Sequence, residues 1–267
     1  MKHTSRIIQI ALIALSITLN ATPHPLGNFT VSHFTRVATD AGELRLRYIV
    51  DYAEIAAFQE LQTLDANRDG LYSKPEKDAW LARTLPQWLA GLRMTADGQP
   101  LTLRVLNQSL TLLPGAVKLF TMRIECELEA SFTISAITRF TLTDSNHTDR
   151  QGWHEIVLEP VPGVTVFDST AFGDGVTNEL KAYPEDKAPL AERAAEWSVT
   201  TGTPPANAKL LRARDGQLIV QSRQRAMRWR KPLLICLALG ALLLALTRWR
   251  RRIRLVVANF FAPARNE

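Results

Sequence analysis

The chain has 267 residues, 46% of them hydrophobic, and a formal net charge of +6 at pH 7. Arginines are concentrated between residues 212 and 254, around a hydrophobic run, which indicates electrostatic contact with a membrane surface. No platform of basic and aromatic residues is apparent elsewhere, so nucleic acid is not an expected partner. The two cysteines cannot form a disulfide within one domain, because Cys236 lies in the hydrophobic run and Cys126 alternates with charged residues as a buried thiol would.

Residues 1–21 predict a secretory signal peptide. Lys2 and Arg6 precede an apolar run over 7–19, and small residues follow it. The run is short for a membrane span. We expect cleavage after Ala21, with an uncleaved anchor as the alternative.

Segments of alternating polarity follow, rich in β-branched and aromatic residues and separated by turn residues. The expected strands cover residues 29–37, 44–50, 92–95, 101–106, 118–132, 134–142, 153–158 and 164–167. Asp97-Gly98 is a strong hairpin signal between two of them. The pattern predicts a mainly β, β-sandwich-like domain over 22–199, with a short helix allowed over 190–197.

A helix–loop–helix insert over 54–90 interrupts the strands. Ile55, Phe58 and Leu61 follow helical spacing in a first helix over 54–64. A second helix over 74–90 has an apolar side and contains Pro86, which is expected to end or kink it. Asp51 and Glu54 are expected to be ordinary surface carboxylates at the start of the first helix.

The loop between these helices, residues 65–76, has the spacing of an EF-hand calcium loop. Its oxygen ligands at positions 1, 3, 5, 7, 9 and 12 are Asp65, Asn67, Asp69, the Leu71 carbonyl, Ser73 and Glu76. Gly70 stands at position 6, where the chain turns sharply. Ca²⁺ is therefore the expected cofactor, with a structural role for a single extracellular hand. An ordinary exposed Asp/Asn/Gly turn is the alternative.

The C-terminal part predicts a linker over 200–231, one transmembrane helix over 232–248 and a basic tail over 249–267. The apolar run 233–247 is short, but Trp229 and Trp249 stand at its edges and arginines flank both ends. A buried core helix is the alternative. The signal peptide would export the residues that precede the transmembrane helix. We therefore expect a single-pass protein of the cell membrane, with most of the chain periplasmic and the tail cytoplasmic.

Several strings resemble the extracytoplasmic N-terminal domain of nickel/cobalt transporter-like bacterial membrane proteins. They are HPLGNFT at 24–30, DYAEI at 51–55, FQE at 58–60, GWHEIV at 152–157 and NELKAYP at 178–184. The resemblance spans about 24–195. In that family the domain precedes several transmembrane helices that hold metal-handling His and Asp residues. In this chain one predicted membrane run, 233–247, follows the domain, and it holds no polar residue that could handle a metal. The resemblance therefore implies the kind of domain and not transport by this chain alone.

Histidines offer a second candidate metal site. His24 with His33 or His154 could bind a transition metal through imidazole nitrogens. A chelate involving the N-terminal amine is disfavoured, because Pro23 has no backbone N–H to deprotonate. The alternative is an exposed His24 with partly packed strand histidines.

No motif for catalysis is present: neither a nucleophile elbow, a zincin helix, a phosphate-binding loop nor a Cys–His pair is found. The sequence predicts a non-catalytic, membrane-anchored calcium-binding domain for interaction. Two alternatives stay open. One is an accessory subunit of a separately encoded nickel/cobalt-type transporter, and the other is an unrecognised hydrolase.

Overall fold

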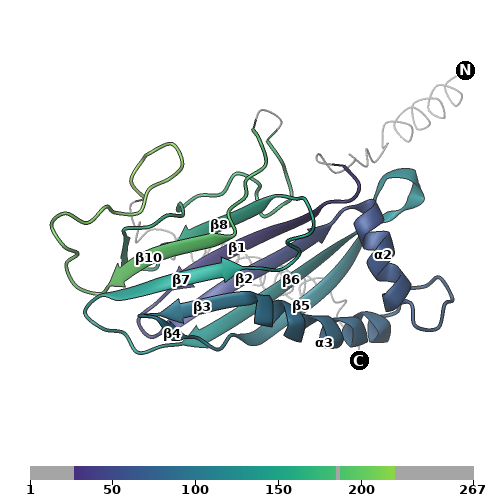
Figure 1. The fold of residues 1–267 in the computed structure, drawn as a ribbon, viewed down its shortest axis with the longest axis horizontal. Helices are drawn as coiled ribbons and strands as arrows, with labels where there is room; N and C mark the ends of the chain where they lie inside the picture. Colours follow the sequence, from purple (N-terminus) through teal and green to yellow (C-terminus); the bar gives the residue numbers. More distant parts are fainter. Residues whose placement is uncertain (1–26, 185–186, 220–267) are drawn as a thin grey trace, which may run out of the picture. The chain divides into compact units, whose positions relative to one another are not determined.

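A computed structural model describes residues 27–184 and 187–219, which form two five-stranded sheets packed together and two α-helices (Figure 1). The mainly β, two-sheet prediction is confirmed. The predicted signal peptide, His24, the transmembrane helix 232–248 and the basic tail 249–267 lie outside the described residues. Within those residues, no helix is both long and apolar enough to cross a membrane.

The first sheet is mixed and has the strand order β5-β6-β2-β1-β8. Its strands are β1 (Val31–Thr39), β2 (Glu43–Tyr52), β5 (Arg104–Pro114), β6 (Phe120–Ser131) and β8 (His154–Glu159). β1 pairs antiparallel with β2 across the turn at 40–42, and parallel with β8 on its other side. The parallel pairing places His33 directly opposite His154.

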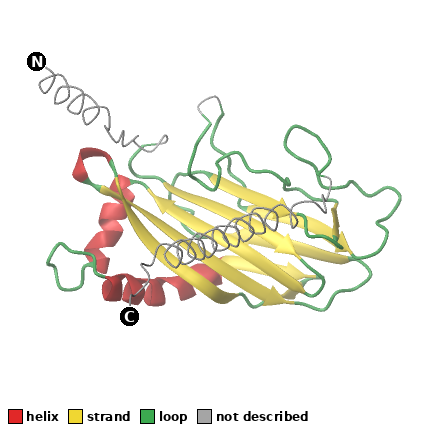
Figure 2. Cartoon of the chain, turned by 180° about the vertical axis from the view of Figure 1, so that it is seen from behind, coloured by secondary structure: helices red, strands yellow, loops and turns green. Residues whose placement is uncertain are grey.

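The second sheet has the order β4-β3-β7-β10-β9, and its pairs are antiparallel. Its strands are β3 (Leu92–Ala96), β4 (Gln99–Pro100), β7 (Thr138–Asp144), β9 (Thr165–Phe167) and β10 (Ala194–Thr200). Figure 2 shows the two sheets from behind. After β7 the chain leaves this sheet through residues 145–153 and enters β8 of the first sheet.

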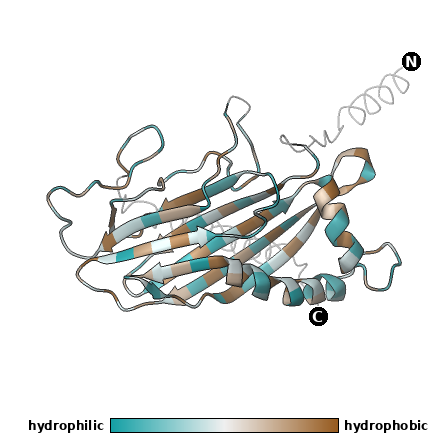
Figure 3. Cartoon of the chain, viewed as in Figure 1, coloured by the Kyte–Doolittle hydropathy of each residue, from teal (hydrophilic) through white to brown (hydrophobic). Residues whose placement is uncertain are grey.

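The core lies between the sheets because the strands alternate in polarity, as the coloured bands in Figure 3 show. Leu46, Ile124, Phe140 and Trp197 are at most 1% exposed. Side chains of this size each contribute about 1.5–3 kcal/mol when fully buried. Cys126 is a free, buried thiol as predicted, and burial raises its pKa to about 12.

The two helices of the insert are α2 (Glu54–Leu64) and α3 (Lys74–Gly91), close to the predicted bounds. α3 begins with a capping box, in which the Ser73 side chain accepts from the Glu76 N–H and the Glu76 carboxylate accepts from the Ser73 N–H. Pro86 lies inside α3 and does not end it. Trp80 and Trp88 are buried on the apolar side of α3, as expected.

Two expectations about local structure are wrong. Residues 190–197 do not form a helix, because β10 begins at Ala194 and buries Ala195, Trp197 and Val199 at a spacing of two. The strand expected over 101–106 does not form: residues 101–103 are not in a strand, and residues 104–106 begin the longer strand β5. β4 closes a short hairpin with β3, and the chain then crosses to the first sheet, where β5 pairs with β6 as far as Pro114.

Two further regions are more buried than the sequence indicated. Asp51 and Glu54 are not surface carboxylates, since they are 7% and 1% exposed, and Glu54 accepts a hydrogen bond from the Ala116 N–H at 2.9 Å. The stretch expected to begin a linker at residue 200 also packs on the sandwich. Leu211 is buried and donates its N–H to the Val166 carbonyl, and Ile219 contacts the core.

Candidate functional sites

The loop over 65–76 forms a closed, exposed turn between α2 and α3. The Asp65 carboxylate accepts hydrogen bonds from the N–H groups of Asp69 and Gly70, at 3.2 and 3.0 Å. Gly70 has φ +74°, which a residue with a side chain rarely adopts. The Glu76 carboxylate accepts from the Ala66 N–H at 3.2 Å and so joins the twelfth position of the loop to the second.

The chemistry of the loop suits calcium, while the present side-chain positions do not yet form a site. All six candidate ligands supply oxygen, the donor that Ca²⁺ requires. Among residues 27–184 and 187–219, however, no group of three or more His, Cys, Asp or Glu side chains is arranged to hold a metal ion. In the loop, Asp65, Asp69 and Glu76 accept hydrogen bonds from backbone N–H groups. These hydrogen bonds close the backbone turn of the loop in the order in which its oxygen donors occur.

The structure brings two of the three candidate transition-metal residues together. His33 and His154 are 2% and 4% exposed, and the centroids of their rings are 4.7 Å apart. His24 lies outside the described residues. In the described part of the chain, His33 and His154 are not members of a group of three side chains that could hold a metal ion. The two histidines are therefore neighbours, as the transition-metal prediction requires, but the structure provides no third ligand.

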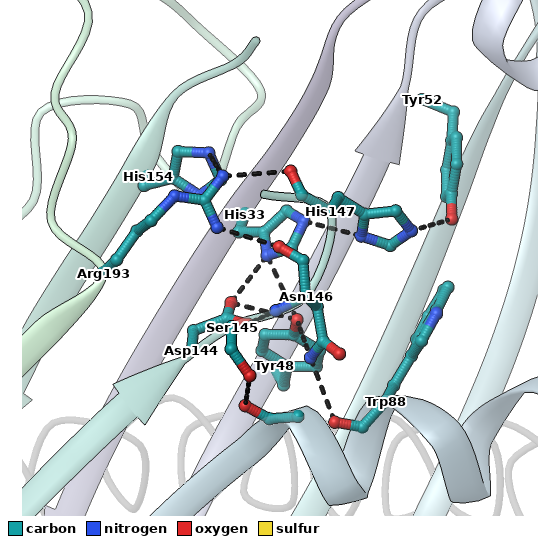
Figure 4. A network of polar contacts seen from close by, with 11 residues as sticks. His33, Tyr48, Tyr52, Trp88, Asp144, Ser145, Asn146, His147, His154 and Arg193 are labelled. Atoms are coloured by element: carbon teal, nitrogen blue, oxygen red, sulfur yellow. Dashed lines mark hydrogen bonds and ion pairs between the residues drawn. The ribbon is translucent and has the colours of Figure 1, made fainter. Parts of the chain in front are cut away.

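His33 belongs instead to a buried polar network that links the two sheets (Figure 4). Its Nδ1 lies 2.6 Å from Oδ2 of Asp144, at the end of β7. The Tyr48 hydroxyl on β2 donates to the same carboxylate oxygen at 3.0 Å, and the Asn146 N–H donates to Oδ1 at 2.9 Å. These donors satisfy both oxygens of a carboxylate that is 4% exposed.

A chain of hydrogen bonds continues from His33 toward β2. His33 Nε2 lies 3.0 Å from His147 Nδ1, and His147 Nε2 lies 2.8 Å from the Tyr52 hydroxyl. His33 donates to Asp144, because an ionised carboxylate can only accept, whereas donor and acceptor in the other two contacts depend on the protons of the two rings.

Burial sets the protonation of this network. It lowers the pKa of His147 to about 4 and that of His154 to about 3, and the neighbouring His33 adds to both shifts. Burial alone would raise the pKa of the Asp144 carboxyl, but its hydrogen bond and charge interaction with His33 outweigh burial and lower it. Burial also raises the pKa of Tyr48 well above its usual value. The arrangement thus favours a charged Asp144 among neutral His147, His154 and Tyr48.

The sequence predictions missed most of this network. Asp144, His147 and Arg193 were not singled out, and neither were Tyr48 and Tyr52. The available signal was weak: the Asp-Ser-Asn-His string at 144–147 reads as an ordinary polar turn after a strand. Its partners on β1 and β2 lie about a hundred residues away in sequence, and only the packing of the two sheets brings them together.

Comparison with known proteins adds no assignment. A scan against protein-family models finds no match, and a search of curated proteins also finds none. The resemblance to the domain of nickel/cobalt transporter-like proteins therefore stays a prediction from the sequence.

Proposed function

We propose that this chain is a membrane-anchored, extracytoplasmic domain that binds one Ca²⁺ through residues 65–76 and acts as a non-catalytic interaction module. The observation that carries the proposal is the closed turn of that loop. Its backbone is held by the Asp65 carboxylate and its two ends are joined by Glu76. Six oxygen donors then occur in the order that a calcium loop needs.

The position of the loop supports a structural role for calcium. α2 ends at Leu64 and α3 begins at Lys74, so the loop is the only covalent link between two helices that bury apolar residues on the sandwich. Tyr72 also packs its ring edge-to-face against Phe120, with centroids 5.9 Å apart. Calcium would hold the ends of α2 and α3 at fixed positions.

The calcium assignment is tested by calorimetry on the purified full chain in a nonionic detergent. We expect one weak site, with a Kd of about 0.1–1 mM, as in extracellular modules. Glu76→Gln removes a charge and weakens both oxygen contacts, so binding should be lost. Asp78→Asn is the matched control, because Asp78 is exposed on the same helix beyond the end of the loop and pairs with Lys74, which is not a candidate ligand. If Glu76→Gln binds calcium as tightly as the wild type, the assignment of the site to this loop is wrong.

The membrane anchor is supported by the apolar run at 233–247 and its flanking tryptophans and arginines. We expect residues 22–230 to be accessible to protease from the periplasm. A reporter that works only in the cytoplasm should be active when it is fused after residue 267. A reporter that works only after export should be inactive at the same position. A reporter that becomes active in the periplasm would show that this run does not stop export.

A second candidate is an accessory subunit of a separately encoded transporter of the nickel/cobalt type. It is favoured by the way the resembling strings meet in the fold. The Asn28 carbonyl accepts from the Ile55 N–H at 2.7 Å, and the rings of Trp153 and Tyr183 lie 5.6 Å apart. The strings therefore pack as one unit. Co-purification of a polytopic membrane protein with the tagged chain would support this role, whereas recovery of the chain alone from mild detergent would count against it.

A further inference from the structure

A cleft of about 380 Å³ opens beside the buried network, between the 145–153 connection and the segment that leads into β10. It is lined by Arg150, Gln151, His154, Pro189, Leu190 and Arg193, among others. Its volume falls at the small end of the range for ligand sites, about 300–1,000 Å³. His154 and Arg193 belong both to the cleft and to the network, and Figure 4 shows their side chains against each other.

Arg193 brings a positive charge to the cleft. Among the described residues, no Asp or Glu oxygen forms an ion pair with it within 4.0 Å. Its guanidinium donates to the carbonyls of Asn146 and His147, at 2.8 and 3.1 Å, and to Nε2 of His154 at 2.8 Å. These contacts use three of the five N–H bonds of a guanidinium and fix its plane, so the others remain for a ligand.

His154 adds a buried donor without a partner. Because Arg193 donates to Nε2, that nitrogen holds the lone pair, and the proton of the neutral ring is on Nδ1. Nδ1 is buried and has no hydrogen-bond partner among the residues described. A buried N–H group is normally satisfied, so an unpaired one beside a cleft points to an acceptor from outside the chain.

The rest of the lining limits the kind of acceptor. Arg150 is 35% exposed at the cleft, with its Nε 3.6 Å from the Asp149 carboxylate and its Nη2 3.0 Å from Gln59. Pro189 and Leu190 give the cleft an apolar wall. Positively charged and neutral donors therefore face a hydrocarbon surface across a small space.

We propose that this cleft binds a small organic carboxylate with a short apolar chain. The carboxylate would accept from Arg193 and from Nδ1–H of His154, and its hydrocarbon part would lie along Leu190 and Pro189. A carboxylate suits a guanidinium because hydrogen bonds between the two charged groups are stronger than those between neutral groups. The site shares no residue with the candidate calcium loop at 65–76.

Isovalerate is a suitable probe, and its neutral amide, isovaleramide, is the matched ligand without the charge. The full chain, labelled with ¹⁵N-histidine and purified in detergent, is titrated with each compound while the Nδ1–H signal of His154 is followed by NMR. Isovalerate should shift this signal in a saturable way at millimolar concentration, and isovaleramide should not. Arg193→Gln should weaken isovalerate binding by about tenfold or more, because a charge-assisted hydrogen bond is lost.

Arg139→Gln is the matched control, since Arg139 is 68% exposed and pairs with Glu196 on the second sheet. It should leave the titration unchanged. If Arg193→Gln does not fold, Arg150→Gln at the exposed rim replaces it and should weaken binding by a smaller factor. The same titration is repeated with inorganic phosphate. If phosphate binds as tightly as isovalerate, the assignment of the site to a carboxylate is wrong. Absence of a saturable shift with isovalerate would overturn the site altogether.

Discussion

The calcium loop and the histidine network are both clusters of polar side chains, but they are built in opposite ways. The candidate ligands of the loop lie within twelve consecutive residues, are exposed or half-buried, and hydrogen-bond mostly to nearby backbone N–H groups. The network joins side chains 111 and 114 residues apart, and His33 and Asp144 at its centre are buried. In the loop the partners come from neighbouring backbone and water can reach the side chains, whereas in the network the partners of His33 and Asp144 come from distant strands and are buried.

This difference predicts that changes in the network alter the free energy of unfolding more than changes in the loop. A buried group that loses its partner incurs the full desolvation penalty, while an exposed group is compensated by water.

Removing the central carboxylate of the network should strongly destabilise the fold. Asp144→Ala leaves His33 and Tyr48 without their shared acceptor, and breaking a buried pair of this kind costs about 3–5 kcal/mol. The free energy of unfolding is measured by urea titration of the full chain in detergent. Asp149→Ala is the control from the same connection, because its carboxylate is 79% exposed and its effect should stay within about 0.5 kcal/mol. Similar losses in both variants would contradict the contrast.

The network should also make stability depend on pH. His147 and His154 have lowered pKa values in the folded chain, about 4 and about 3, so the unfolded chain binds protons more readily. Their contribution is complete above the unfolded value of about 6.5 and is lost as the pH falls toward 4. Between pH 8 and pH 5 we expect a decrease of about 1–2 kcal/mol for each histidine.

Urea titrations of the wild type and of His147→Gln across this range check the prediction. The variant should have a shallower pH dependence, because one of the two histidines no longer titrates. Glu76 in the calcium loop should not contribute, since hydrogen bonds from Ser73 lower its pKa and keep it ionised throughout. If the pH dependence is unchanged in His147→Gln, His147 does not contribute to the pH dependence of stability.

Calcium should have the smallest effect. A ligand that binds only the folded state stabilises it by RT ln(1 + [L]/Kd), which is about 1.4 kcal/mol for 1 mM calcium and a Kd of 0.1 mM. Melting the full chain with calcium and with EDTA should show a rise of a few degrees. Binding of a hydrophobic dye at 25 °C should not change. Calcium-dependent dye binding by the folded chain would indicate a sensor and not a structural site.

The parts of the fold that the sequence predicted are those that local periodicity controls. Alternation located most strands, and the helical spacing of Ile55, Phe58 and Leu61 located α2. Local cues failed where tertiary pairing decides. Residues 190–197 contain good helix formers, yet Trp197 is buried by pairing of β10 with β7. The sequence also could not show that the chain crosses between sheets after Pro100, because that step depends on which neighbour accepts each strand.

The same division applies to the candidate sites. The candidate calcium loop could be proposed from the sequence because its ligand positions are fixed by distance along the chain, and calcium binding there stays a prediction. His33 and His154 were picked out by residue type alone, without their partners. That His33 would meet Asp144, and His154 would meet Arg193, follows from the parallel pairing of β1 with β8 and from the course of the chain after β7. Neither leaves a periodic signal in the sequence.

The capping box of α3 has a consequence for an environment in which calcium varies. Ser73 and Glu76 hold the first turn of the helix through their mutual hydrogen bonds, and these bonds need no metal. Only side-chain rotamers, and not the course of the backbone, would be ordered when an ion arrives, which keeps the entropy lost on binding small. If the loop binds calcium as proposed, a fall in calcium is therefore expected to leave α3 wound and its buried tryptophans in the core.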